Sequence, residues 1–261
     1  MSVPAARRDQ RLRRHPLRRL RLPVAGGTLS LVVPKDDSAA HARAAGASAA
    51  RRAGGAEPPY WATVWPAAIA LARWLCRRGD LAGRRALDLG CGTGAAGAAA
   101  VRCGASVTFA DRDPDALAFA GFNGRAQLPE DSQDVARDRA ARVREQLLDW
   151  HTTTLDGAFD LLLLADVSYR PVHHAPLLRH LRGCLRPDGM AVHADPLRRE
   201  SDGFLVQARA EFAHRELRVD THFDGARRSV RLWFLARDEA ALTRWLGAGD
   251  RAAAPAATER P

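Results

Sequence analysis

Apolar and polar residues along the chain follow two alternating patterns from residue 59 onward. Short apolar runs, typical of buried strands, are separated by longer segments with the apolar spacing of helices. Strands are predicted near residues 84–89, 105–110, 143–148, 160–166 and 189–194. Helices are predicted near residues 66–78, 95–103, 113–125, 172–185 and 202–213. This alternation predicts an α/β fold with a doubly wound, Rossmann-like sheet.

Two further strands are predicted near residues 215–222 and 228–236, with only the segment FDGAR between them. That connection is too short for a parallel crossover, so one of the two strands must run antiparallel to its neighbours. We therefore expect seven strands, mostly parallel, with an antiparallel final strand.

A shorter alternating pattern at residues 19–33, around Gly26-Gly27, predicts a β-hairpin ahead of the main domain. No apolar run approaches the ~18 to 20 residues of a membrane-spanning helix, so we expect no membrane partner. The expected parts are a basic disordered tail (1–18), the hairpin (19–35), an Ala/Gly/Arg-rich linker (36–58), the main domain (59–245) and a disordered C-terminal tail (246–261).

The net charge of +10 is concentrated at the N-terminus. Residues 1–22 contain eight arginines and one acid, whereas the rest of the chain carries 32 basic and 29 acidic residues. The basic segment is interpreted as a solvated tail, through which nucleic acid could bind, or as a mitochondrial transit peptide. The Arg- and Ala-rich composition favours a bacterial cytoplasm. The four cysteines lack a CxxC pair and the histidines lack ligand spacing, so no metal site is expected.

The candidate chemistry begins in ALDLGCGTGAAGAAA, residues 86–100. An apolar strand ends near Asp88 and passes through Gly90, Gly92 and Gly94 into a helix of small residues. Such glycines let the backbone approach a ligand closely, and the helix N-terminus presents free N–H groups. Asp111 ends the next strand, where its carboxylate could accept both hydroxyls of a ribose. The pattern predicts a cofactor loop.

Two kinds of cofactor compete for this loop, because Gly92, Gly94 and Gly97 also satisfy the dinucleotide pattern GxGxxG. A pyrophosphate would be repelled by Asp88, whereas the positive ammonium and sulfonium of S-adenosylmethionine would be attracted. S-adenosylmethionine is therefore favoured over NAD or FAD, and a simple tight turn is the remaining interpretation.

With these motifs the chain resembles the seven-strand, class I S-adenosylmethionine-dependent methyltransferases. Four further segments are similar to the lysine methyltransferase group that acts on the electron-transfer-flavoprotein β-subunit. They are PYWATVWPAAIALARWL (59–75), LLDW (147–150), LLADVSY (163–169) and HADP (193–196). The resemblance implies an enzyme that methylates lysine side chains of a protein, either that flavoprotein subunit or a ribosomal stalk protein.

The resemblance also implies roles for single residues. Asp166 and Tyr169 match a DxxY motif and would be catalytic, with Asp166 stabilising the positive charge that develops on the acceptor nitrogen. Trp61, Asp195 and Pro196 would form the substrate rim. The residues implied to bind the cofactor are Trp65, Asp88, Gly90, Cys91, Gly92, Gly94, Asp111, Arg112, Asp149, Trp150 and Asp166. Trp61, Trp65 and Trp74 also fit ordinary packing.

Three features depart from the group's pattern: the GCGTG loop itself, an apparent insertion at residues 127–141, and Arg170-Pro171 directly after the DxxY motif. The GCGTG loop identifies the cofactor better than the subfamily, and the other two features could reshape the choice of acceptor. A small-molecule N- or O-methyltransferase, and an RNA-associated protein with a methyltransferase-like domain, remain alternatives. The oligomeric state is not determined by the sequence.

Overall fold

A seven-stranded sheet with strand order β5-β4-β3-β6-β7-β9-β8 forms the centre of the protein. The computed structural model describes residues 10–35, 60–128, 141–155 and 157–247. The five parallel strands are β3 (Arg85–Leu89), β4 (Ser106–Asp111), β5 (Val143–Leu147), β6 (Phe159–Ala165) and β7 (Leu185–Asp195). Strand order reverses between β3 and β6, which makes their carboxyl ends the switch point where such sheets bind ligands.

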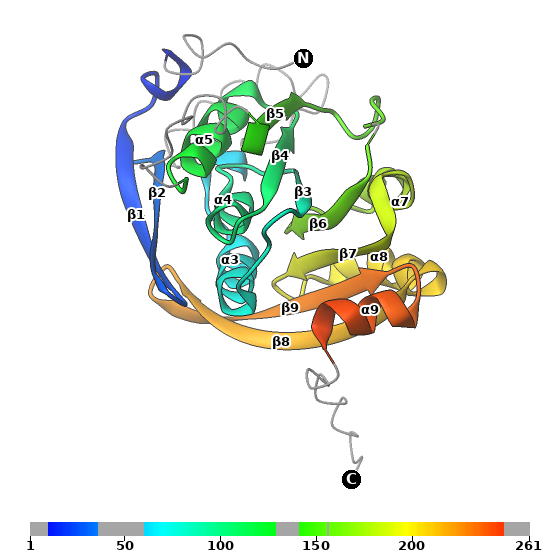
Figure 1. The fold of residues 1–261 in the computed structure, drawn as a ribbon. Helices are drawn as coiled ribbons and strands as arrows, with labels where there is room; N and C mark the ends of the chain where they lie inside the picture. The colour runs from blue at the N-terminus through cyan, green and yellow to red at the C-terminus, as the bar shows by residue number, and fades with distance from the viewer. Residues whose placement is uncertain (1–9, 36–59, 129–140, 156, 248–261) are drawn as a thin grey trace.

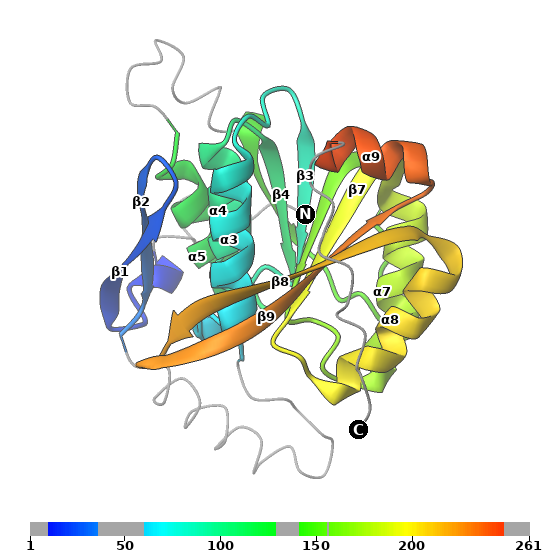
Figure 2. The same cartoon turned by 90° about the horizontal axis from the view of Figure 1, so that it is seen from below.

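Strand β9 (Ala226–Ala236) lies between β7 and β8 (Ala213–Phe223) and runs antiparallel to both. The predicted antiparallel final strand is thus confirmed. Figure 2, which is viewed from below, shows this long hairpin crossing in front of the parallel strands.

Helices cover both faces of the sheet, as the doubly wound pattern predicts (Figures 1 and 2). One face carries α3 (Pro66–Arg78), α4 (Ala95–Arg102) and α5 (Pro114–Arg125), and the other carries α7 (Pro171–Cys184) and α8 (Arg199–Glu211). Proline at the first position of α3, α5 and α7 favours the start of each helix, because its missing N–H costs nothing there.

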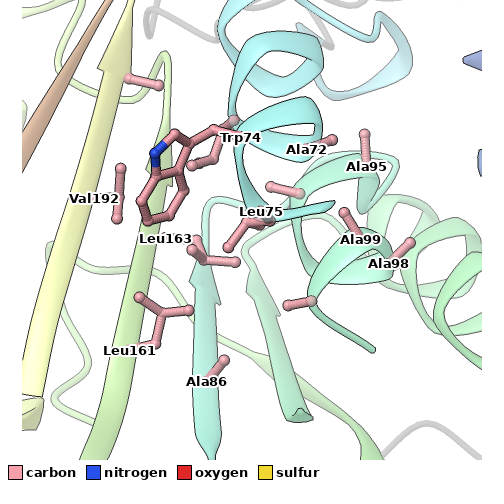
Figure 3. Packing of buried hydrophobic residues seen from close by; sticks show 14 of the residues in the cluster. Ala72, Trp74, Leu75, Ala86, Ala95, Ala98, Ala99, Leu161, Leu163 and Val192 are labelled. Carbon is pink, nitrogen blue, oxygen red and sulfur yellow. The ribbon is translucent and has the colours of Figure 1, made fainter. Parts of the chain in front are cut away.

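The core on the α3 side combines alanines of α3 and α4 with large apolar side chains, Trp74 among them. Trp74 of α3 lies beside Leu163 and Val192 of the sheet, while α3 and α4 meet through alanines (Figure 3). The ring of Trp74 packs on Phe234, with centroids 4.9 Å apart. Trp74 is therefore a core residue.

The predicted N-terminal hairpin is present as a separate two-stranded sheet of β1 (Leu17–Val24) and β2 (Gly27–Pro34). It packs against the main domain through Asn123 of α5. The Asn123 side chain accepts a hydrogen bond from Val32 N–H at 2.7 Å and donates to the carbonyls of Val32 and Thr93, each at 2.9 Å. One buried amide therefore ties the hairpin to the glycine loop.

The structure differs from the expected tail over residues 10–16. Leu12 is buried, Arg11 donates to Asp115 at 2.6 Å, and the His15 ring lies 5.5 Å from Trp61 and 5.7 Å from Phe119. Leu12 and the His15 ring, which stand among the arginines, supply packing contacts, so this part of the basic segment packs on α5.

The remaining differences concern element ends. Strand β7 begins at Leu185, directly after α7, and the C-terminal helix α9 (Glu239–Leu246) was not predicted. Asp238 caps α9 by accepting the N–H of Ala241, and its Leu242 and Trp245 are buried. The expected linker at 36–58, most of the apparent insertion at 127–141, and all but the first two residues of the expected tail at 246–261 lie outside the described residues. No described helix is long and apolar enough to cross a membrane.

Candidate functional site

The glycine loop after β3 is held in left-handed backbone conformations that favour glycine. Gly90, Gly92 and Gly94 have φ of +72°, +53° and +81°. An added Cβ at Gly94 would lie 2.6 Å from the backbone of Ala120, and at Gly90 it would lie 2.8 Å from the Trp150 ring. These glycines allow the loop to pass between α5 and the β5–β6 connection.

Asp88 is buried beneath the N-terminus of α4. Its Oδ2 atom accepts the backbone N–H of Gly97 at 2.8 Å. Burial, with a smaller contribution from the nearby charge of Asp111, raises the pKa of Asp88 to about 7, against the lowering effect of the Gly97 hydrogen bond. The Asp88 carboxylate therefore already accepts a backbone N–H that a phosphate bound at the N-terminus of α4 would need.

Asp111 ends β4 beside the same loop. Its Oδ2 accepts the N–H of Gly92 at 3.0 Å and its Oδ1 accepts the N–H of Asp113 at 2.9 Å. Burial raises the pKa of Asp111 to about 6, against the lowering effect of these two hydrogen bonds. Within the described residues neither Asp88 nor Asp111 forms a salt bridge. The loop is thus flanked by two buried carboxyl groups that have no salt-bridge partner in the described part of the chain, although the charge of Arg112 lowers the pKa of Asp111.

Four further residues expected at the cofactor lie in this loop or in the segments after β4 and β5. The Trp150 ring approaches Gly90, and Asp149 accepts the N–H of His151 at 2.9 Å. Cys91 follows Gly90 in the loop, and burial raises the pKa of its thiol. Arg112 is exposed immediately after Asp111.

Asp166 follows β6 and is buried, with a left-handed φ of +57°. Both carboxylate oxygens accept hydrogen bonds from one guanidinium: Arg198 Nε lies 2.6 Å from Oδ1 and Arg198 Nη2 lies 2.8 Å from Oδ2. This pair raises the pKa of Arg198. A left-handed, non-glycine residue costs about 1–3 kcal/mol and is typical of functional sites.

A row of four aromatic rings lies next to this ion pair; we call Tyr60, Trp65, Tyr169 and Phe223 the aromatic row. Successive centroid distances are 5.7 Å between Tyr169 and Tyr60, 6.1 Å between Tyr60 and Trp65, and 6.3 Å between Trp65 and Phe223. The guanidinium carbon of Arg198 lies 6.0 Å from the Trp65 ring centroid. The row therefore joins η1 (Tyr60–Ala62), the segment after β6 and the end of β8.

A buried polar network fixes the segment from Asp166 to Tyr169. The Ser168 hydroxyl donates to Ser201 at 2.9 Å and lies 2.7 Å from His193 Nε2, while the Ser168 carbonyl lies 3.0 Å from His174 Nε2. Burial lowers the pKa of His193 to about 3, so this ring is neutral. The network is wholly buried and holds the backbone that presents Asp166 and Tyr169.

His173 connects the two halves of the site. Its ring lies 5.2 Å from that of Tyr169 and 5.4 Å from that of Trp150, and its Nδ1 lies 2.9 Å from His151 Nε2. The segment from Asp166 to Tyr169 and the segment after β5 are thereby packed as one unit.

Two of the expected rim positions have other surroundings. The Trp61 ring packs against His15 and Phe119, outside the aromatic row, while its backbone faces the loop, with the carbonyl oxygen 3.1 Å from a Cβ placed on Gly92. Asp195 is buried and accepts hydrogen bonds from Arg231 and from the N–H of Arg198. Pro196 follows it and is partly exposed.

Sequence reasoning missed three residues of the site: Tyr60, Arg198 and Phe223. Tyr60 lies within the quoted aromatic segment, and Arg198 follows Asp195-Pro196 at two residues' distance, so both had a local signal. Phe223 had none, because it reaches Trp65 only through the β8–β9 hairpin. Among the described residues, no group of three or more His, Cys, Asp or Glu could hold a metal ion.

Comparison with known proteins finds a match to a lysine methyltransferase family model over residues 60–208. The chain is 35% identical over 169 residues to the protein N-lysine methyltransferase METTL21A of Danio rerio, covering 62% of this chain and 73% of that protein. It is 36% identical to the electron transfer flavoprotein beta subunit lysine methyltransferase of Danio rerio, covering 51% of this chain but 48% of that protein.

The fold is similar to a solved structure, the N-methyltransferase NodS from Bradyrhizobium japonicum in complex with S-adenosyl-L-homocysteine. The TM-score is 0.50 at 15% identity, and the match covers 72% of this chain and 97% of that chain.

Proposed function

The chain belongs to the lysine methyltransferase family, and from that premise we propose that it transfers methyl groups from S-adenosylmethionine to lysine side chains of a protein. The observation that carries the proposal is the position of Asp166. This buried carboxylate and the aromatic row lie at the same edge of the sheet as the glycine loop and Asp111.

The residues around the loop fit this cofactor. Asp88 and Asp111 are buried acids without a salt bridge to a described residue, so a ligand carrying positive charge would complete their environment. The Asp111 oxygens keep lone pairs that could accept ribose hydroxyls. By contrast, a dinucleotide pyrophosphate would meet Asp88 under the α4 N-terminus. When bound, S-adenosylmethionine supplies an electrophilic methyl group.

The protein has to present a neutral amine. A lysine of pKa ~10.4 is protonated near pH 7.5, and removing its proton costs about 4 kcal/mol. Exclusion of water from the acceptor site removes solvation from the ammonium form and lowers this cost. As the amine attacks, its nitrogen becomes positive, so the fixed carboxylate of Asp166 stabilises the transition state more than the neutral ground state. Tyr169 would wall the acceptor site through its contact with Tyr60.

The proposed acceptor is a protein of the kind that the resemblance implied, the electron transfer flavoprotein β-subunit or a ribosomal stalk protein. The similarity to the electron transfer flavoprotein beta subunit lysine methyltransferase of Danio rerio supports the first of these two acceptors. The composition supports a bacterial cytoplasm as the setting.

The experiment incubates purified protein with tritiated S-adenosylmethionine and a lysate of its own source, followed by a gel and fluorography. We expect a discrete labelled protein band that disappears with Asp166→Asn. The matched control is Glu211→Gln. This variant removes an exposed ion pair between Glu211 at the end of α8 and Arg182 of α7, and it should leave the band unchanged. Label confined to small molecules, or to a fraction sensitive to ribonuclease, would overturn the protein-lysine proposal and favour one of the two alternatives.

A further inference from the structure

The carboxylate assigned to the acceptor nitrogen already has a cationic partner in the free protein. Arg198 contacts both oxygens of Asp166, in a two-pronged geometry that covers one edge of the carboxylate. The Asp166 side chain is 3% exposed, whereas that of Arg198 is 36% exposed. The acid is thus fixed inside the protein, and its partner reaches it from the surface.

The surroundings of this guanidinium are those that an alkylammonium group also requires. A carboxylate neutralises its charge, and Trp65 presents a ring whose face attracts cations, with Tyr60 and Phe223 packed against that ring. We propose that Arg198 occupies the acceptor-lysine site in the free protein, as an intramolecular stand-in for the substrate, and that the incoming lysine binds by displacing the guanidinium from Asp166. This inference rests on the proposed function, because that function defines the acceptor site.

The exchange keeps the charges balanced. Removing the partner of a buried carboxylate without replacement leaves an uncompensated charge and is strongly destabilising, but one cation replacing another avoids that cost. The exchange also selects substrates, because a lysine arrives as an ammonium that can replace the guanidinium and loses its proton afterwards, whereas a side chain that never carries a positive charge cannot replace Arg198.

Once displaced, the Arg198 side chain can turn towards a second acid, Glu200. The Arg198 backbone is anchored, because its N–H donates to Asp195 Oδ1 at 3.0 Å, so only the side chain has to move. Glu200, exposed in the first turn of α8, already attracts the guanidinium charge. The neighbouring Arg231 is different: its side chain is 12% exposed and lies between Asp195 and Asp202, which fits a structural role.

The sequence makes a direct test possible, because Lys35 is the only lysine in the chain. In Arg198→Lys, the amine would stand at the acceptor site and become a substrate in cis. Its nitrogen would form a bond to the methyl carbon as the carbon–sulfur bond breaks, releasing S-adenosylhomocysteine and a proton to solvent. We expect mass spectrometry to find methylation at position 198 in purified Arg198→Lys after incubation with S-adenosylmethionine.

The matched control is Arg182→Lys, since Arg182 makes the same two-pronged contact with Glu211 away from the site. This variant should remain unmethylated at position 182, and Arg198→Lys combined with Asp166→Asn should lose the modification at position 198. Equal methylation at positions 182 and 198, or none at 198, would count against the assignment.

A second variant does not depend on the reach of the new side chain. Arg198→Ala should open the site to n-butylamine, which matches the end of a lysine side chain. Without cofactor, calorimetry should show binding of n-butylammonium at least tenfold tighter to Arg198→Ala than to the wild type. With cofactor, n-butylamine turnover should rise by a similar factor. Unchanged binding would overturn the proposal. The wild type is tested on lysate in parallel. If it labels no protein band there, the proposed function itself is refuted.

Discussion

The Asp111 carboxylate accepts the backbone N–H of Gly92 at 3.0 Å, which joins the end of β4 to the glycine loop after β3. Its second oxygen is held by Asp113 N–H. The acid is therefore oriented by the fold before any ligand binds, so that little ordering of this side chain is needed on binding.

Asp111→Ala should weaken the cofactor more than it weakens catalysis. The variant loses an oriented acceptor for two hydroxyls, and we expect the affinity for S-adenosylhomocysteine to fall at least tenfold by titration calorimetry. Turnover at saturating cofactor should fall less. Asp149→Ala provides a comparison at another residue implied to bind the cofactor, whose carboxylate accepts the N–H of His151 in the adjoining turn. Normal affinity in Asp111→Ala would exclude the ribose role.

Asp166→Asn should have the opposite profile. The amide has a single oxygen and no charge, so it cannot stabilise the nitrogen as it becomes positive. We expect turnover to fall at least 100-fold, with cofactor affinity within threefold of the wild type. The partly exposed Arg198 can turn to solvent, so the variant should remain folded by circular dichroism. A tenfold loss of cofactor affinity would contradict this assignment.

Stability should depend on pH through Asp88. Its pKa is about 7 in the folded protein, against about 3.9 in an unfolded chain, so the folded state binds more protons between these values. The contribution of Asp88 to the free energy of unfolding is therefore full below about pH 4 and is lost as the pH rises to about 7. Asp88→Asn keeps an oxygen for Gly97 N–H but does not ionise.

The measurement is urea denaturation of both proteins at pH 5 and pH 8. Relative to Asp88→Asn, the wild type should lose about 2–3 kcal/mol between the two pH values. The comparison removes the opposite contribution of buried His193, whose lowered pKa makes stability rise with pH. A constant difference between the two proteins would show that Asp88 is not ionising in this range.

Gly97 should be needed for packing, although its backbone conformation is helical. An added Cβ would overlap the ring of Phe109 and lie 2.8 Å from Asp88 Oδ2. Gly97→Ala should lower the free energy of unfolding by about 1–3 kcal/mol. Gly183→Ala in α7 has no atom within 4 Å of the new Cβ and should be neutral or stabilising by up to about 1 kcal/mol. Equal effects in chemical denaturation would refute the packing explanation.

The sequence predicted the strands, most helices and the position of the glycine loop between β3 and α4, because these depend on local patterns. Glycine spacing and an acid at a strand end are local signals, and they placed Asp88 in β3 and Asp111 at the end of β4; their roles at the cofactor stay predictions. The pairing of Asp166 with Arg198 could not be predicted, because the two residues are 32 positions apart and meet only when β6 and β7 align. Helix α9 was missed because it has only eight residues, too few for its apolar spacing to stand out.

The N-terminal segment before β1 should stabilise the site despite its basic composition. His15 packs on Trp61 and Phe119, and the Trp61 backbone lies next to Gly92, so the segment supports the loop from outside. His15→Ala should lower the free energy of unfolding by about 1–2 kcal/mol and weaken cofactor binding a few-fold. Arg13→Ala is the control, because Arg13 is exposed in the same segment and should change stability by less than about 0.5 kcal/mol. If both variants behave as the wild type in thermal and cofactor titrations, the segment before β1 does not support the loop, and the prediction is wrong.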